Sequence, residues 1–395
     1  MTRVPFLFRI EKGNESMKAI KNALVMDAKA RECRPMNIYY EGNTIIKLTP
    51  AAEPVNLPEE DVLDAEGCYT TCGLIDGHTH LGVIADGQGF EGMDVNEKTD
   101  PVTPNMRAID AINPQDRNFT EALQGGVTVA AAGPGSANAI GGTFACIHTY
   151  DSVIDDMIIK YPMAMKAAFG ENIKRCHGLE KGRTPLTRMG IAALIRDTLQ
   201  KAVEYKNDPH HKFDAKLEAM VPVVEGKLPL KCHAHLGIDM LTAIRIAKEF
   251  HLKITLDHCT DILSVQDAVL AFGCPLFMGP TLHHRTKIET RSLSFKAVAE
   301  TSKKADVCII TDAPVIPLHY LPLCVGLAID AGMDEWKALE AVTLNPAKAI
   351  GIDDRYGSLE AGKEADIVVW KKKPFVSVTS PKIVVAGGHN VALTE

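Results

Sequence analysis

The chain is organised around one stretch, Cys72-Gly-Leu-Ile-Asp-Gly-His-Thr-His-Leu-Gly82. Its apolar pair Leu74–Ile75 predicts a short β-strand, and His78 and His80 follow two positions apart. Because alternate side chains of a strand share one face, both imidazoles can point toward a single cation. Neutral imidazole is the commonest metal ligand in proteins. A catalytic metal needs about three protein ligands and an open position, so further ligands are expected elsewhere in the chain.

Eight apolar runs predict strands, and helical patterns separate several of them. The runs are residues 73–78, 127–132, 144–149, 164–169, 228–233, 253–258, 275–278 and 307–311, with helices expected at 191–205, 239–250 and 336–342. Eight strand–helix repeats over roughly 280 residues fit a (β/α)8 TIM barrel, and a doubly wound open sheet is the alternative. The barrel is favoured because polar residues gather at the carboxyl ends of these runs, where barrel enzymes keep their chemistry.

Both ends of the chain are expected to build a small β domain beside the barrel. Before the barrel, strands are predicted at 19–25, 36–40, 44–48 and 64–69 in a small antiparallel unit, and after it at 367–370 and 382–386. We therefore expect an α/β protein with a β-sandwich domain of residues 17–70 and 358–395 and a barrel of residues 71–357. Residues 1–16 are predicted to be a disordered extension, because Met17 opens a more typical beginning.

Composition excludes several classes of protein. The net charge is −7, and the sequence has no basic run with interleaved aromatic residues. Both features argue against a nucleic-acid-binding surface. The longest apolar stretches fall far short of the ~20 residues that span a bilayer. The ten cysteines are scattered, mostly in apolar segments, as expected for reduced thiols in a cytoplasmic protein. We expect a cytoplasmic protein that acts on a small molecule, without a nucleic-acid or membrane partner, and leave a homo-oligomer open.

Four other strand ends carry candidate ligands. They read Met165-Lys-Ala-Ala-Phe-Gly-Glu171, Leu230-Lys-Cys-His-Ala-His235, Thr255-Leu-Asp-His258 and Ile309-Ile-Thr-Asp312. Convergence of these ends would bring His233, His258 and Asp312 to the first histidine pair, which is a credible hydrolytic metal site. His233 is preferred over His235 because it lies nearer the end of the strand at the barrel axis, and Asp312 alone could instead cap a helix.

The motifs together resemble the amidohydrolase superfamily, specifically its imidazolonepropionase-like metal-dependent hydrolases. The resemblance runs from about residue 18 to 395 and includes Gly73–His80, Gly126-Val-Thr, Pro134–Asn138, Phe169-Gly-Glu-Asn172, Thr311-Asp312 and the ending from Thr343-Leu-Asn-Pro-Ala to Gly362-Lys-Glu-Ala-Asp366. It implies a metal-bearing barrel flanked by a β-sandwich. It also implies that activated water hydrolyses an amide or cyclic amide C–N bond of a dipeptide, an N-acyl amino acid or an imidazolone-like compound.

The resemblance also implies a set of metal ligands. His78, His80 and Asp312 would hold one divalent cation, with Zn²⁺ expected, and His233 with His258 would hold a second, so that the chain carries one or two. In many relatives a carboxylated lysine at the end of the fourth strand bridges the metals, and Lys166 is similarly placed. Burial would favour the neutral amine that carboxylation needs. Glu171 is the alternative bridging ligand.

Asp312 is the expected catalytic residue, because a carboxylate touching both metal and water can take the proton and pass it to the leaving nitrogen. Ala313-Pro314 stands where several relatives have a histidine. Substrate contacts are expected from His235 and, in the loop after the seventh strand, from His283, His284 and Arg285, whose guanidinium could hold a carboxylate. A solvated loop is the alternative interpretation of that segment.

Two other functions stay open. A mononuclear version of the site could deaminate a cyclic amidine without Lys166 as a bridge, and one metal per chain would favour it. A non-catalytic relative with an assembly or regulatory role is the second alternative, which the full set of candidate ligands argues against.

Overall fold

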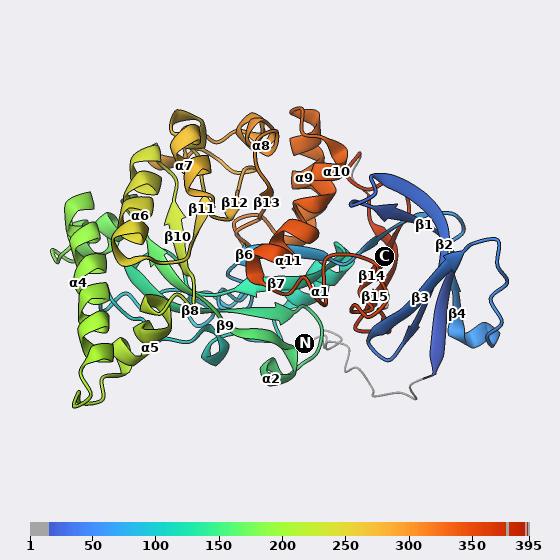
Figure 1. Ribbon diagram of the computed structural model, residues 1–395, viewed down its shortest axis with the longest axis horizontal. Helices are drawn as coiled ribbons and strands as arrows, with labels where there is room; N and C mark the ends of the chain where they lie inside the picture. Colours follow the sequence, from blue (N-terminus) through green and yellow to red (C-terminus); the bar gives the residue numbers. More distant parts are fainter. Residues whose placement is uncertain (1–15, 377–378, 392, 394–395) are drawn as a thin grey trace.

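A computed structural model describes residues 16–376, 379–391 and 393, which form two eight-stranded sheets (Figure 1). The predicted extension, residues 1–16, lies outside the described residues except for Ser16. No helix within these ranges is long and apolar enough to cross a membrane. All ten cysteines are free thiols.

The first sheet has the strand order of a barrel. Its neighbours follow the chain in sequence: β6 (Leu74–Thr79), β7 (Val127–Ala132), β8 (Ile140–His148), β9 (Ile158–Ala168), β10 (Leu230–Ala234), β11 (Ile254–His258), β12 (Leu276–Met278) and β13 (Val307–Ile309). A doubly wound sheet would reverse its order at one point, and this sheet does not. The eight predicted runs all overlap these strands.

The barrel is nearly closed, and a short segment fills the gap between its first and last strands. Ile75 in β6 and Ile309 in β13 donate backbone hydrogen bonds to the carbonyls of Val342 and Ala341, at 2.8 and 3.0 Å. The buried carboxylate of Asp76 adds a second bridge, accepting hydrogen bonds from the backbone and hydroxyl of Thr311 at 2.9 and 2.6 Å. These contacts hold the two strands whose ends carry His78 and Asp312 beside each other.

The prediction of eight strand–helix repeats is wrong at β8. This strand pairs antiparallel with both β7 and β9. The connections on either side, residues 133–139 and 149–157, are too short for a parallel crossover, which needs a dozen or more residues. The second connection holds only the single turn α2 (Ile154–Met157). The remaining neighbours from β9 to β13, and the pair β6–β7, are parallel.

Helices cover the outside of the barrel (Figure 1). Those within the described ranges include α1 (Arg117–Gln124), α3 (Glu171–Ile173), α4 (Arg188–Asn207), α5 (Ala215–Val224), α6 (Gly237–Phe250), α7 (Gln266–Phe272), α8 (Phe295–Ser302), α9 (Leu321–Asp330), α10 (Glu335–Glu340) and α11 (Leu344–Ile350). The predicted helices coincide with α4, α6 and α10. The helix α11 is not among the predicted helices; its Pro346 lies in the first turn, where proline is tolerated.

The two chain ends share the second sheet, as expected. Its order is β16 (His389–Val391), β15 (Pro381–Ala386), β14 (Ile367–Trp370), β5 (Tyr69–Cys72), β1 (Met17–Asp27), β2 (Glu32–Glu41) and β3 (Thr44–Pro50), with β4 (Val62–Asp64) also paired to β1. The sheet is mixed, because β4 and β5 run parallel to β1. The pairing gives one continuous sheet, so the sandwich form is not confirmed, and the domain boundaries stay a prediction. The strand predicted at 64–69 is wrong: residues 65–68 turn between β4 and β5.

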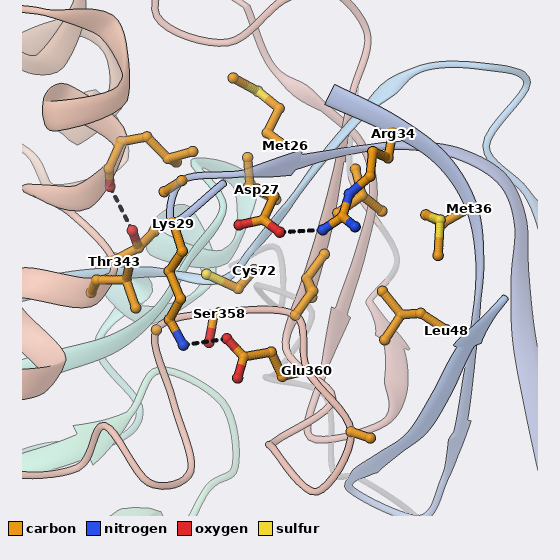
Figure 2. A pocket seen from close by; sticks show the side chains of 18 residues that line it. Met26, Asp27, Lys29, Arg34, Met36, Leu48, Cys72, Thr343, Ser358 and Glu360 are labelled. Atoms are coloured by element: carbon orange, nitrogen blue, oxygen red, sulfur yellow. Dashed lines mark hydrogen bonds and ion pairs between the residues drawn. The ribbon is translucent and has the colours of Figure 1, made fainter. Parts of the chain in front are cut away.

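A cavity of about 310 Å³ lies where the second sheet meets the barrel (Figure 2). Apolar side chains such as Met26, Met36 and Leu48 line it. Lys29 and Glu360 form an ion pair there at 2.5 Å, and Asp27 forms another with Arg34. None of the candidate metal ligands lines this cavity.

Candidate metal centre

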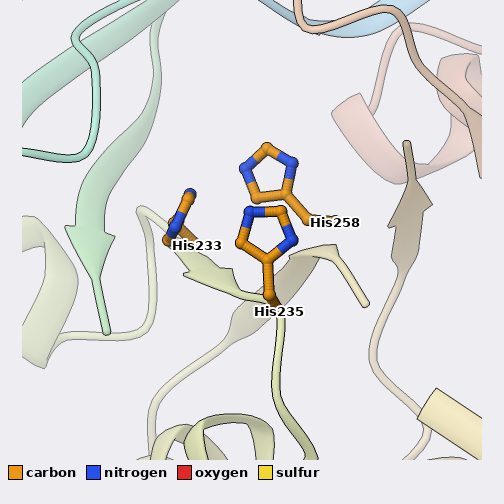
Figure 3. A group of neighbouring side chains, drawn as sticks. All are labelled: His233, His235 and His258. Carbon is orange, nitrogen blue, oxygen red and sulfur yellow. The ribbon is translucent and has the colours of Figure 1, made fainter. Parts of the chain in front are cut away.

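Two groups of potential metal ligands gather at the carboxyl end of the barrel strands. His78 and His80 at the end of β6 join Asp312, which follows β13. The other group is His233, His235 and His258, at the ends of β10 and β11; Figure 3 shows their rings close together, with His235 stacked on His258. Within each group the ligand atoms lie within 4.8 Å of one another. The ring centroids of His78 and His258 are 5.0 Å apart, so the two groups adjoin.

Four of the five histidines are tethered through Nδ1. His78 bonds Asp257 at 3.0 Å, His80 the carbonyl of Gly133 at 2.8 Å, His258 the carbonyl of Gly279 at 2.7 Å, and His235 the hydroxyl of Thr260 at 2.7 Å. A carboxylate or carbonyl acceptor requires the proton on Nδ1, which leaves Nε2 as a free lone pair. The protein therefore presents Nε2 of His78, His80 and His258 as electron-pair donors.

The arrangement fits a cation. Nε2 of His80 lies 3.2 Å from Oδ1 of Asp312, and with Nδ1 of His80 protonated there is no hydrogen between these two acceptors. Nε2 of His233 is buried and has no hydrogen-bond partner within the described part of the chain. Such groups are unfavourable when buried unless a donor or a cation joins them. The residues present therefore suit a divalent metal with nitrogen and oxygen ligands.

The backbone at two of these residues is strained. Asp312 has a φ of 56° and His258 a φ of 77°. Non-glycine residues in the left-handed region cost about 1–3 kcal/mol each and cluster at functional sites. The strain here turns each side chain at the point where its strand ends.

Lys166 in β9 is fully buried against the first group. Its Nζ lies 3.4 Å from Nε2 of His78. Burial lowers the pKa of Lys166 to about 8, although Asp257 and Asp312 oppose this effect. A substantial fraction of neutral amine at neutral to mildly alkaline pH follows from that value.

Burial also shifts the pKa values of other titratable groups of the centre. Burial and the charge of Lys166 lower the pKa of His78 and of His233 well below the ordinary histidine value. Burial and the neighbouring His233 lower the pKa of His235 to about 3. Burial alone would raise the pKa of Asp312, but the charges around it, including that of Lys166, hold the pKa below its usual value. The buried imidazoles of His78, His233 and His235 are therefore neutral and the carboxylate of Asp312 is ionised, which is the protonation state that metal binding needs.

Sequence reasoning missed the buried pair Lys231 and Asp257 behind the centre. Oδ1 of Asp257 accepts hydrogen bonds from Nζ of Lys231 at 3.0 Å and from the hydroxyl of Thr255 at 3.1 Å, while Oδ2 bonds His78. Nζ of Lys231 also lies 3.8 Å from the centre of the Phe277 ring. The available signal was two charged residues inside apolar strand runs, since a buried charge needs a partner.

Gly77 in β6 allows this packing. A Cβ at this position would lie 2.1 Å from the Phe277 ring, which is far inside van der Waals contact. Any larger residue would therefore push that ring out of its place over Lys231.

The other predicted site residues lie apart from the two groups. Glu171 pairs with Arg175 at 2.8 Å, so of the two candidate bridges only Lys166 contacts a ligand histidine. His283, His284 and Arg285 are exposed. Arg285 donates to the carbonyl of Leu293, at 2.8 Å in its own loop.

His235, in contrast, lies among the ligand atoms themselves, which the preference for His233 did not anticipate.

The chain belongs to the amidohydrolase family, which matches residues 69–391. An amidohydrolase from Thermotoga maritima MSB8, known as a crystal structure, is 35% identical with a TM-score of 0.89 over 95% of this chain and 99% of that one. An imidazolonepropionase of Pseudomonas putida is 23% identical over 368 residues, 87% of this chain and 90% of that protein. This similarity confirms the resemblance inferred from the motifs.

A further relative is much longer than this chain. Amidohydrolase tasK of Hapsidospora irregularis is 28% identical over 382 residues, which cover 86% of this chain and 38% of that protein. The chain thus spans about two fifths of the length of that relative.

Proposed function

We propose that this chain is a metal-dependent hydrolase that cleaves an amide or cyclic amide C–N bond of a small molecule. The observation that carries the proposal is the adjoining pair of ligand groups at the carboxyl end of the barrel, with the neutralisable Lys166 against His78. The imidazolonepropionase relative, named for a cyclic amide substrate, supports this bond type.

We assign His78, His80 and Asp312 to one divalent cation, with zinc expected, and His233 with His258 to a second. His235 lies beside the second set. A divalent cation bound there would lower the pKa of a water molecule toward ~7 and polarise a carbonyl. The hydrogen bonds at Nδ1 fix the rings of His78, His80 and His258, so these three ligand atoms need little reorganisation when a cation binds.

Asp312 supplies the acid–base chemistry in this proposal. Its carboxylate is ionised at neutral pH because its pKa is held low. It accepts a proton from the attacking water at Oδ1, the oxygen near His80, and gives that proton to the leaving nitrogen as the C–N bond breaks.

Lys166 is the proposed bridge between the two cations. Its neutral amine would add to the carbon of carbon dioxide and lose one proton to solvent, and the resulting carbamate would offer two oxygen atoms as ligands. Two adjacent cations would stabilise that anion.

A mononuclear deaminase is the second candidate. The group His78, His80 and Asp312 is complete as three ligands without Lys166, and such a site has an open position for water. We also retain as proposals the boundaries of the two domains, a cytoplasmic location, a small-molecule partner and a homo-oligomer.

The test is the metal content per chain of protein purified without chelator, together with the intact mass of Lys166-containing peptides under conditions that preserve a carbamate. Two metals with a carboxylated lysine, and hydrolysis of a dipeptide or N-acyl amino acid, are expected. Lys166→Met should lose one metal and most activity. Lys160→Met is the control, because Lys160 lies on the same strand but donates to the Ile350 carbonyl; it should keep both metals and full activity. One metal with an unmodified lysine would favour the deaminase, and no metal would overturn the catalytic proposal.

A further inference from the structure

Glu289 is a buried carboxylate at the mouth of the barrel that neither ligand group includes. It lies in the short helix η5 (Ile288–Thr290) and is 1% exposed. Its Oε2 accepts a hydrogen bond from the backbone N–H of Glu171 at 2.9 Å. Its Oε1 has no hydrogen bond within the described part of the chain and lies 3.9 Å from both Nε2 of His233 and Nζ of Lys287.

A buried carboxylate oxygen without a donor is unfavourable, more so than a neutral group in the same place. Lys287 does not hydrogen-bond to it, because its Nζ lies 3.9 Å from Oε1, beyond hydrogen-bond distance, and donates to Oδ1 of Asn172 at 2.5 Å. The neighbouring buried carboxylate of Asp239, in contrast, has a hydrogen-bond donor at each oxygen. Both of its oxygens accept hydrogen bonds from Arg188, at 2.9 and 3.1 Å, so that buried carboxylate is paired at each oxygen.

The loop after β9 holds Glu289 in place. Gly170 has a φ of 99°, and a Cβ there would lie 2.8 Å from Oε2 of Glu289 and 3.2 Å from Oδ2 of Asp239. With Oε2 fixed by the Glu171 N–H and the loop packed against it, the carboxylate presents Oε1 toward His233. The open oxygen therefore faces the candidate metal centre.

A metal ligand role does not fit Glu289 well. Its oxygens belong to neither set of mutually close ligand atoms. Lys287 supplies a positive charge at 3.9 Å but no hydrogen bond, so the partner that would complete Oε1 is a cationic nitrogen on a molecule bound at the centre. Such a nitrogen would supply a charge-assisted hydrogen bond, the stronger kind.

We infer that Glu289 binds the α-ammonium of the substrate, and that the substrate is an aminoacyl amide with a free amino group, such as a dipeptide. This rests on the proposed function, which places the scissile carbonyl at the cations near His233. An α-ammonium is two covalent bonds from that carbonyl carbon, so a carbonyl at the centre brings its ammonium to the open Oε1. An N-acyl amino acid carries no charge at that position and would leave the carboxylate buried and unpaired.

The test compares two ligands on the zinc-loaded full chain by titration calorimetry. One is the α-aminophosphonic acid analogue of L-leucine, and the other is its N-acetyl derivative. Both offer the same phosphonate to the cations, so the difference in affinity reports the ammonium. Wild type should bind the free amine at least about tenfold more tightly, and Glu289→Gln should reduce the preference to within about twofold.

Glu171→Gln is the matched variant, because it removes a carboxylate of the same mouth that already pairs with Arg175. It should retain the preference for the free amine. Zinc content and melting temperature establish whether Glu289→Gln is folded; if it is not, the wild-type comparison decides alone. Equal affinity of wild type for both ligands, or a full preference in folded Glu289→Gln, overturns this inference only. Binding of neither ligand to wild type overturns the proposed function as well.

Discussion

Asp257 decides which nitrogen of His78 faces the candidate metal centre. Its Oδ2 accepts the Nδ1 proton of His78, and Lys231 compensates its charge on the other side at 3.0 Å. All three side chains are fully buried. A carboxylate behind a histidine fixes the tautomer and raises the basicity of the opposite nitrogen. The pair Lys231–Asp257 would therefore act on a bound metal through His78.

Asp257→Asn should weaken zinc binding by about 10–100-fold. The neutral amide oxygen accepts a weaker hydrogen bond from Nδ1 than a carboxylate does, and the substitution leaves Lys231 buried without its counter-ion. The measurement is the zinc dissociation constant from competition with a chromogenic chelator. Thr255→Val is the control, because it removes a hydrogen bond to Asp257 at 3.1 Å but not the one to His78; its effect should be much smaller. An unchanged zinc affinity in Asp257→Asn would contradict the role assigned to this carboxylate.

At the scale of an element, the turn between β9 and α3 positions the mouth of the barrel. Gly170 lies in this turn at a positive φ, in contact distance of both buried carboxylates, Glu289 and Asp239. A side chain there would meet conformational strain and a steric clash together. The turn and the carboxylates are therefore one packed unit.

Gly170→Ala should lower the free energy of unfolding by about 2–4 kcal/mol, from backbone strain and overpacking. It should also weaken binding of the aminophosphonate, since Glu289 must move. Gly182→Ala is the matched control, because Gly182 has a φ of 60° with open space around its Cβ position. That variant should lose only about 1–2 kcal/mol and keep the ligand affinity. Urea unfolding and calorimetry give both quantities, and equal losses in the two variants would argue against the clash.

At the scale of the whole molecule, Asp366 links the second sheet to the barrel. Its backbone carbonyl accepts a hydrogen bond from Gly73, just before β6, at 2.9 Å, and its Oδ1 accepts one from Gly387 at 2.8 Å. Burial raises the pKa of Asp366 to about 7 from its usual 3.8, although hydrogen bonds to its carboxylate oppose the rise. The folded protein therefore binds a proton here that the unfolded chain releases near pH 4.

This raised pKa predicts a stability that depends on pH. Protonation of Asp366 contributes to the free energy of unfolding. This contribution is fully present below about pH 4 and is lost as the pH rises toward about 7, because the folded state binds more protons than the unfolded state in that window. Asp366→Asn lacks this titration, so its stability relative to wild type should rise from pH 5 to pH 7 by up to a few kcal/mol and then level off. Urea unfolding across pH 5–8 measures the difference. Asp354→Asn, at an exposed site, should show the same pH dependence as wild type. A difference in the free energy of unfolding between Asp366→Asn and wild type that does not change with pH would contradict the prediction.

Metal removal should destabilise the molecule as a whole, because the ligands come from strands at opposite sides of the sheet order, β6 and β13 with β10 and β11. A ligand at about 1,000 times its dissociation constant adds about 4 kcal/mol, so chelation should lower the melting temperature by several degrees. Zinc should restore it. Magnesium at the same concentration should not, since it prefers oxygen ligands. An identical melting temperature with and without chelator would count against a resident metal.

The local patterns of the sequence determined the strand runs of the barrel, the β-strands at each chain end and the histidines at strand ends. They did so because side-chain alternation, apolar burial and turn chemistry act between residues close in the chain. The His78–His80 spacing and the runs ending at His258 and Asp312 are of this kind.

Only the tertiary structure decided the antiparallel direction of β8, the single continuous second sheet, and the contacts of Asp257 and Glu289. Asp257 meets a histidine 179 positions away in the chain, and Glu289 meets the backbone of a residue 118 positions away. No local pattern encodes such a pairing, because the two groups come within hydrogen-bond distance only once the barrel has brought the strand ends together.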